Sequence, residues 1–268
     1  MATRSRLDAE LVRRGLVPSR EQAAAAIASG RVLVGGRPAA KPATAVAPGE
    51  PIVVRGDDPG WASRGAHKLL GALEAFAAAD PPLTVAGRRC LDAGASTGGF
   101  TDVLLRHGAA SVLAVDVGYG QLLWRLRNDE RVTVLDRTNV RYLTAADVGD
   151  PLQLVVGDLS FIPLHLVLPA LSAVTGPDTD LVLLVKPQFE VGRERLGAGG
   201  VVRDPELRAA AVRGVAGAAC PLGFGVAGVV ASPLPGPAGN VEYLLWLRPG
   251  AGPLDEDALR TAIADGPS

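Results

Sequence analysis

The stretch that decides the fold is Asp92-Ala93-Gly94-Ala95-Ser96-Thr97-Gly98-Gly99-Phe100-Thr101. An apolar run from Arg89 to Asp92 leads into it and an amphipathic run from Phe100 to His107 follows, so we expect a strand, a glycine-rich turn and a helix. Such a turn lets a ligand approach the backbone and presents the N–H groups of a helix N-terminus to it. The spacing differs from GxGxxG and lacks the Lys-Ser/Thr pair of a P-loop. A tight turn without a ligand is the alternative interpretation.

From Arg88 onward, strand-like runs alternate with helix-like runs. The predicted strands are 89–92, 111–116, 132–135, 152–157, 180–185, 225–232 and 241–248, and the predicted helices are 99–107, 119–127, 163–173 and 205–219. This alternation predicts an α/β fold, a parallel sheet with helices on both faces. The turn at 235–239 joins the last two strands directly, so we expect an antiparallel hairpin at one edge of a seven-stranded sheet.

Ionisable side chains stand at the ends of five consecutive predicted strands: Asp92, Asp116, Asp136, Asp158 and Lys186. Ligand sites in such sheets lie at the carboxyl ends of the strands. Any one of these aspartates could instead be a helix N-cap. Five in a row favour a site, in which Asp116 is placed to accept hydrogen bonds from ribose hydroxyls.

Residues 1–55 form a basic module with nine Lys or Arg and four Asp or Glu, in a chain of net charge −1. The pattern predicts helices at 6–15 and 20–29, with Ser19 as N-cap, and a β-ribbon from 32–34, 37–38 and 51–55. This order resembles the RNA-binding module of a small-subunit ribosomal protein, pseudouridine synthases and tyrosyl-tRNA synthetases. The expected phosphate contacts are Arg4, Arg6, Arg13, Arg14, Arg20, Arg31 and Arg37. An ordinary solvated basic face is the alternative.

An acidic, glycine- and proline-rich segment follows this module. We therefore expect an RNA-binding α+β domain at 1–55, a linker at 56–62 and a larger domain at 63–268. Trp61, after the linker, is expected to dock the two domains, with stacking on a base as the alternative. Trp124 and Trp246 lie in apolar periodic runs and are expected in the core.

The chain has 24 Arg but only three Lys: Lys41, Lys68 and Lys186. Arg keeps its proton in proteins, whereas Lys can be tuned to act as a base, so a surviving Lys can mark a position where Arg will not serve. Lys68 is predicted in the first turn of a helix ahead of the sheet. Glu242 lies early in the last predicted strand, either on a solvent face or in the site. Together with Asp158 and Lys186 they form a candidate tetrad.

The loop from Asp92 to Phe100 resembles the S-adenosylmethionine loop of Rossmann-like class I methyltransferases. The order Lys68, Asp158, Lys186, Glu242 resembles the catalytic set of RNA ribose 2′-O-methyltransferases of the FtsJ type. Three further strings, with the N-terminal module, are similar to the TlyA family, often labelled hemolysin-like. They are Ser63-Arg64-Gly65-x-His67-Lys68-Leu69, Val185-Lys186-Pro187-Gln188-Phe189-Glu190 and Gly239-Asn240-x-Glu242-Tyr243.

The resemblance implies S-adenosylmethionine as cofactor and ribosomal RNA or ribosomal subunits as partner, with cytidine ribose 2′-hydroxyls as targets. The cofactor-binding residues it implies are Asp92, Gly94, Ser96, Thr97, Gly98, Gly99, Phe100, Asp116 and Asp136.

A ribose hydroxyl is a poor nucleophile, so methyl transfer to it needs a base nearby. We expect Lys186 to be that base, because crowding against Lys68 and a sulfonium cation would lower its pKa from about 10 toward neutrality. Lys68, Asp158 and Glu242 would orient the reacting groups. Too close a pairing of Asp158 with Lys186 would undo the depression. No metal is required.

No apolar run reaches the roughly 18 residues of a membrane span, and the N-terminus lacks the apolar stretch of a signal peptide. We therefore expect a cytoplasmic monomer. Two alternatives remain open: a membrane-active, hemolysin-like protein, and a non-catalytic RNA-binding protein that keeps a cofactor fold. An NAD-dependent enzyme lacks the right glycine spacing.

Overall fold

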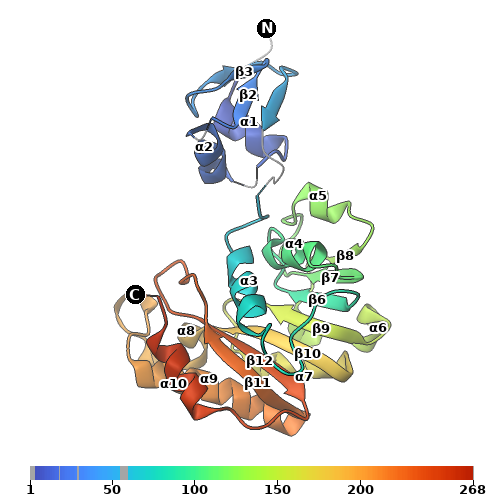
Figure 1. The fold of residues 1–268 in the computed structure, drawn as a ribbon, viewed down its shortest axis with the longest axis vertical. Helices are drawn as coiled ribbons and strands as arrows, with labels where there is room; N and C mark the ends of the chain where they lie inside the picture. The colour runs from blue at the N-terminus through green and yellow to red at the C-terminus, as the bar shows by residue number, and fades with distance from the viewer. Residues whose placement is uncertain (1–3, 18, 29, 55–59, 268) are drawn as a thin grey trace.

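The computed structural model describes residues 4–17, 19–28, 30–54 and 60–267. Its N-terminal elements are grouped together in Figure 1: β1 (Ser5–Arg6), α1 (Leu7–Arg13), α2 (Arg20–Ala28), β2 (Val32–Val34), β3 (Arg37–Pro38), β4 (Ala45–Val46) and β5 (Ile52–Val54). The predicted order of two helices and a ribbon is confirmed, and Ser19 Oγ accepts from the Gln22 N–H at 3.2 Å, as an N-cap does. Ser29, Arg55 and most of the predicted linker lie outside the described residues.

The described part of the larger module is built on a seven-stranded sheet with the order β11-β12-β10-β9-β6-β7-β8. The strands are β6 (Arg89–Ala93), β7 (Ser111–Val115), β8 (Val132–Leu135), β9 (Leu152–Gly157), β10 (Thr175–Val185), β11 (Phe224–Ala231) and β12 (Tyr243–Pro249). Strands β6 to β10 run parallel, and β12 pairs antiparallel with both β10 and β11. The predicted edge hairpin is confirmed. The chain reverses direction across the sheet between β6 and β9, where ligand sites of such folds lie.

Helices cover both faces of this sheet (Figure 1). Helices α3 (Ala66–Ala75) and α4 (Gly99–Arg106), with the short α5 (Trp124–Arg127), contribute to the core on one face. The core on the other face includes residues of α6 (Ala145–Val148), α7 (Leu168–Ala173), α9 (Pro205–Ala219) and α10 (Glu256–Ala264). The short α8 (Pro187–Glu190) directly follows β10. The predicted three-layer α/β arrangement is therefore confirmed.

Two local predictions are wrong. The helix expected at 119–127 is reduced to α5, because Gly118 and Gly120 extend an irregular turn, and Trp124 is 76% exposed rather than in the core. The last strand begins at Tyr243, so Glu242 precedes the strand instead of lying within it. Trp246, by contrast, is fully buried in β12 as expected and packs against Phe76.

A buried carboxylate ties the sheet together at the end opposite the glycine-rich turn. Asp180 accepts hydrogen bonds from Arg88 Nη1 at 2.5 Å, Arg248 Nε at 2.7 Å and Trp246 Nε1 at 2.7 Å. Burial alone would raise the pKa of Asp180, but the bonds from Arg248, Arg88 and Trp246 outweigh it and hold the pKa below its ordinary value. The ionised carboxylate therefore stabilises the fold.

We expect Asp180→Ala to lower the free energy of unfolding by about 3 kcal/mol, because it leaves two guanidinium groups without their shared partner. The contribution is present above the ordinary aspartate pKa and is lost as the pH falls through the lowered pKa. Urea denaturation at pH 7 measures the change. The exposed neighbour Asp178→Ala is the matched control and should stay within about 0.5 kcal/mol of the parent. Equal stabilities of the two variants would contradict the assignment.

Candidate active site

The glycine-rich turn between β6 and α4 is packed so closely that side chains are excluded. Gly94 (φ +85°) and Gly98 (φ +99°) have left-handed backbones that favour glycine. A Cβ on Gly94 would lie 2.9 Å from the carbonyl oxygen of Asp158, and one on Gly98 would lie 2.3 Å from Leu126 Cδ1. The loop is thus a tightly packed backbone turn at the carboxyl end of the first strand.

Asp92 lies beneath this loop rather than at its surface. It is fully buried, and its Oδ2 accepts from the N–H and the hydroxyl of Thr101 at 2.8 and 2.7 Å. Burial raises the pKa of Asp92 to about 7, against the opposing effect of these hydrogen bonds. Its Oδ1 has no hydrogen-bond partner in the described chain. Asp92 therefore anchors the start of α4 and keeps one free acceptor atom.

A cavity of about 670 Å³ opens beside the loop, at the ends of β6, β7 and β9. Of the predicted cofactor residues, Gly94, Ser96 and Asp116 line it. Asp116 accepts from the N–H groups of Ser96 and Gly118 at 2.8 and 2.7 Å, which orients its carboxylate and leaves lone pairs for a ligand.

Asp136 does not line this cavity, since it accepts hydrogen bonds from the Gly120 N–H and from Arg127. Sequence reasoning missed most of the other lining residues, which come from loops after the strands: Val117, Gln121, Thr138, Asn139, Arg141, Ser160 and Phe161.

A smaller cavity of about 300 Å³ adjoins the first and shares Gly94, Ser96, Asp158 and Ser160 with it. Thr97, Gly99 and Phe100 of the glycine-rich loop line this second cavity, as do Lys68 and Lys186. Gly98 is buried and lines neither cavity. The cavity of about 670 Å³ is large enough for a nucleoside-sized cofactor, and it adjoins the cavity of about 300 Å³ that the two lysines line.

Three residues of the candidate tetrad, Lys68, Asp158 and Lys186, line the smaller cavity, and Glu242 contacts Lys68. Lys186 Nζ lies 2.5 Å from Asp158 Oδ1, and Lys68 Nζ lies 2.6 Å from Glu242 Oε2. Asp158 bridges the two pairs, because its Oδ2 is 3.5 Å from Lys68 Nζ. Positive and negative groups thus alternate along one connected row.

Three of the four charged side chains in this row are almost fully buried. The Lys68 and Lys186 side chains are each 8% exposed, Glu242 is 1% exposed, and Asp158 is 23% exposed. Glu242 Oε1 has no hydrogen-bond partner among the described residues. Of the two alternatives for Glu242, the structure excludes the solvent face.

Four of the seven predicted RNA-binding arginines of the N-terminal module pair with two buried carboxylates. Asp8 pairs with Arg6 and Arg20, at 3.0 and 2.7 Å, and Glu10 pairs with Arg13 and Arg14, at 2.6 and 2.7 Å. Hydrogen bonds from Arg13 and Arg14 lower the pKa of Glu10 to about 2, and those from Arg6 and Arg20 lower that of Asp8.

Exposure distinguishes these arginines from one another. The side chain of Arg14 is only 21% exposed and also donates to the carbonyl of Glu50, whereas those of Arg6, Arg13 and Arg20 are 53–67% exposed. Arg4, Arg31 and Arg37 are exposed as well. Arg14 therefore also links the helices of this module to its ribbon.

The chain entering the larger module is fixed to the glycine-rich turn through α4. Asp102 accepts from the Ala62 N–H at 2.9 Å and from the guanidinium groups of Arg106 and Arg125. Arg106 also stacks on Trp61, 4.3 Å from its ring centroid. Trp61 thus packs on this helix, whereas a second contact with the N-terminal module, which docking would require, stays a prediction.

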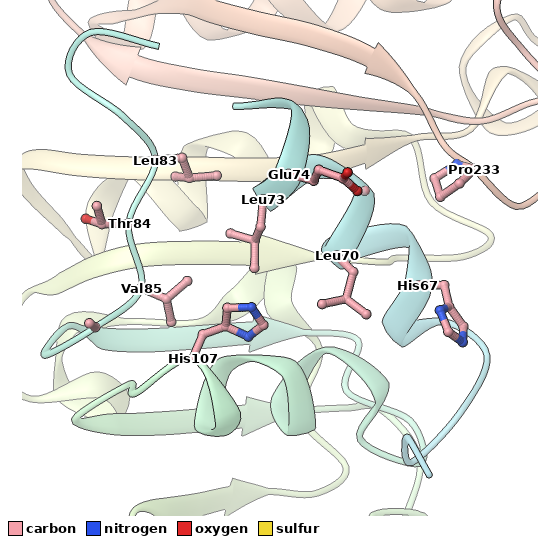
Figure 2. Close-up of a pocket in the computed structure, with 11 residues that line it drawn as sticks. His67, Leu70, Leu73, Glu74, Leu83, Thr84, Val85, His107 and Pro233 are labelled. Atoms are coloured by element: carbon pink, nitrogen blue, oxygen red, sulfur yellow. The ribbon is translucent and has the colours of Figure 1, made fainter. Parts of the chain in front are cut away.

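A separate cavity of about 790 Å³ lies elsewhere, between α3, the end of α4 and Pro233 (Figure 2). His67, His107 and Glu74 project around an apolar floor that includes Leu70 and Val85. None of the tetrad residues lines it, although Lys68 is the neighbour of His67 on α3. This cavity is therefore separate from the candidate tetrad.

The sequence matches two family models: "FtsJ-like methyltransferase" over residues 61–249 and "S4 domain" over residues 5–52. It is 60% identical to the 16S/23S rRNA (cytidine-2′-O)-methyltransferase TlyA of Mycobacterium tuberculosis, over the full length of both chains. It is 44% identical to a protein of Bacillus subtilis named as an rRNA methyltransferase, YqxC, over 93% of this chain and 88% of that one. A solved structure titled as a hemolysin from Streptococcus thermophilus superposes with a TM-score of 0.72 at 36% identity, covering 98% and 96% of the two chains.

No helix in the described ranges is both long enough and apolar enough to cross a membrane. The same residues contain no group of three or more His, Cys, Asp or Glu that could hold a metal ion.

We expect Gly98→Ala to weaken S-adenosylmethionine binding at least tenfold, because the new methyl group meets Leu122 and Leu126 and forces alanine into a left-handed backbone. Isothermal titration calorimetry with the full chain measures this change. Gly214→Ala in α9 is the control, since its Cβ would meet nothing within 4 Å. Unchanged affinity in Gly98→Ala would show that the tight packing of this turn is not needed for the cofactor.

Proposed function

We infer the activity of this chain from its family, since it belongs to the FtsJ-like methyltransferases and, with an S4 domain ahead of the catalytic part, to their TlyA-type members. It is an S-adenosylmethionine-dependent methyltransferase. The substrate we propose is a ribose 2′-hydroxyl of a cytidine in ribosomal RNA, the substrate that names its relative of 60% identity. The observation that carries this proposal is the buried row of Lys68, Asp158, Lys186 and Glu242 where the two cavities meet.

The residues that line the cavity of about 670 Å³ beside the glycine-rich loop fit the cofactor. The backbone cradle of Gly94, which a Cβ would fill, suits close approach of a ligand, and the oriented Asp116 carboxylate suits ribose hydroxyls. Ser96 completes this wall, and Thr97, Gly99 and Phe100 continue it toward the smaller cavity. When bound, the cofactor supplies a methyl group attached to a positively charged sulfur. Asp92 and Gly98 support the loop from beneath, and Asp136 does so through the turn at Gly120.

In this proposal Lys186 removes the proton of the ribose hydroxyl. An ammonium group at Lys186, paired with Asp158 at 2.5 Å, must first give up a proton before it acts as a base. A pairing this close is expected to oppose loss of that proton. A sulfonium group entering beside Lys186 would favour loss of that proton, because like charges disfavour one another.

The other members of the row hold Lys186 in place. Asp158 bridges the two lysines, and Lys68 keeps that bridge oriented through its own pair with Glu242. Glu242 is rigid because it is 1% exposed and packed against Gly236, where a Cβ would lie 2.6 Å from its Oε1. Holding the base and the hydroxyl in one geometry could supply on the order of 7–11 kcal/mol of the barrier reduction.

The S4 domain contributes the RNA-binding surface of this proposal. Its exposed arginines can neutralise phosphates, while Asp8 and Glu10 limit their rotamers before RNA arrives. We place the domain boundaries at 1–55, 56–62 and 63–268, which agrees with the separate cores of the N-terminal module and of the sheet. A soluble, monomeric enzyme in the cytoplasm, acting on ribosomal subunits, completes the proposal.

Lys186→Arg keeps the positive charge but cannot act as a base, so we expect loss of methyl transfer by a factor of at least 100. Transfer of tritiated methyl groups to separated ribosomal subunits measures this, and calorimetry should show S-adenosylmethionine binding within about threefold of the parent. Lys41→Arg, the same change at an exposed lysine, is the matched control. Near-normal transfer by Lys186→Arg would refute the base, and no transfer by the parent chain would favour a non-catalytic RNA-binding protein.

Arg37→Gln should weaken binding of ribosomal RNA and reduce the slope of log affinity against log salt by about one, the expectation for one lost phosphate contact. Filter binding over a range of salt concentrations measures both quantities. Arg260→Gln removes a similarly exposed arginine on α10 and should leave the slope unchanged. Identical behaviour of the two variants would argue against the S4 surface as the RNA contact.

A further inference from the structure

A serine that sequence analysis left without a role touches the proposed base. Lys186 Nζ donates a hydrogen bond to Ser160 Oγ at 2.8 Å, in addition to its ion pair with Asp158. Ser160 follows the carboxyl end of β9 and is exposed. It lines both cavities, so its hydroxyl lies where cofactor and substrate would meet.

The geometry of an amine gives this contact its meaning. The nitrogen of a lysine has four tetrahedral positions, and in Lys186 the side-chain carbon, Asp158 and Ser160 account for three of them. The fourth carries a proton in the ammonium form and the lone pair in the neutral form. Because Lys186 lines the smaller cavity, this fourth position is the one left for a hydroxyl bound there.

Asp158 by itself does not define that direction. With only its side-chain carbon and Asp158 fixed, the neutral amine could carry its lone pair in either of the two remaining tetrahedral positions, and Asp158 is also shared with Lys68 at 3.5 Å. A second acceptor from a different atom removes this freedom. A serine hydroxyl can fix this direction because it accepts a hydrogen bond from either the ammonium or the neutral amine. It carries no negative charge that would hold the proton on Lys186.

We propose that Ser160 is a positioning residue for Lys186, whose hydroxyl, together with Asp158, aims the lone pair of the neutral amine at the ribose 2′-hydroxyl. The inference rests on the proposed function. In the step it serves, the hydroxyl O–H bond breaks as an N–H bond forms on Lys186. The oxygen takes the methyl group, and the electron pair of the broken S–C bond stays on sulfur. Lys186 then releases the proton to water.

Other charged groups also face Lys186 and contribute to any pH dependence. Asp158 after β9 contacts Lys186 directly, and Lys68 on α3 and Arg64 line the same cavity. Glu242 before β12 acts through its pair with Lys68. Asp116 and Arg141 line the larger cavity, and Glu190, whose pKa is raised to about 7 by burial, lies one helical turn after Lys186. Replacing Ser160 changes none of these charges, so a displaced pH–rate profile reports the lost hydroxyl.

The test is Ser160→Ala in the full chain, assayed by methyl transfer to ribosomal subunits across pH. We expect kcat to fall ten- to a hundredfold, while KM for the subunits and calorimetric affinity for S-adenosylmethionine stay within about twofold. The rising limb of the pH–rate profile should shift to lower pH by about half to one unit. The reason is that the ammonium form donates a stronger hydrogen bond to Ser160 than the neutral amine does, so its loss disfavours the ammonium form. Ser160→Thr should restore both properties, and Ser172→Ala on α7 serves as the control.

Three results would overturn the inference: parental kcat and profile in Ser160→Ala, a lower kcat with an unmoved limb, or no restoration by Ser160→Thr. An unmoved limb would mean a merely structural contact. The proposed function fails separately. If Lys186→Arg stays active, the base assignment is wrong; if it is inactive and Ser160→Ala behaves like the parent, only the role of the serine is lost.

Discussion

Two lysines and two carboxylates meet at the carboxyl end of the sheet, where Lys68, Lys186 and Glu242 are buried and Asp158 is partly exposed. An unpaired charge in the protein interior is expensive, whereas a connected row of opposite charges offsets much of that cost. Lys68 pairs with Glu242, Lys186 pairs with Asp158, and Asp158 joins the pairs. The row holds α3, the end of β9, the end of β10 and the segment before β12 in one arrangement.

Asp158 connects this row to the cofactor loop. Its N–H donates to the carbonyl of Ala93 at 3.1 Å, and its own carbonyl sits so close to Gly94 that only glycine fits there. Its carboxylate at the same time contacts both lysines. Asp158 therefore contacts the glycine-rich turn and both lysines at once, and it lines both cavities.

The order of strands and helices could be predicted from the sequence because it depends on local patterns. Apolar runs of strand length, glycine at left-handed positions and ionisable residues at strand ends are all visible in one dimension, and they located Asp116, Asp158 and Lys186. The prediction failed where tertiary packing determines which side chain is buried. Trp124 lies in an apolar run but is exposed, because α5 is a short helix in which Leu126 takes the buried position beside the glycine turn.

The sequence by itself determined the class of fold, the glycine-rich cradle and the set of residue types available for chemistry, since these follow from local conformation and periodicity. Only the tertiary structure decided which of those residues touch. Lys68 and Glu242 are 174 positions apart, and no local pattern encodes their 2.6 Å contact. The same holds for Asp92, which lies under the loop, and for Ser160, whose contact with Lys186 exists because β9 and β10 pair side by side.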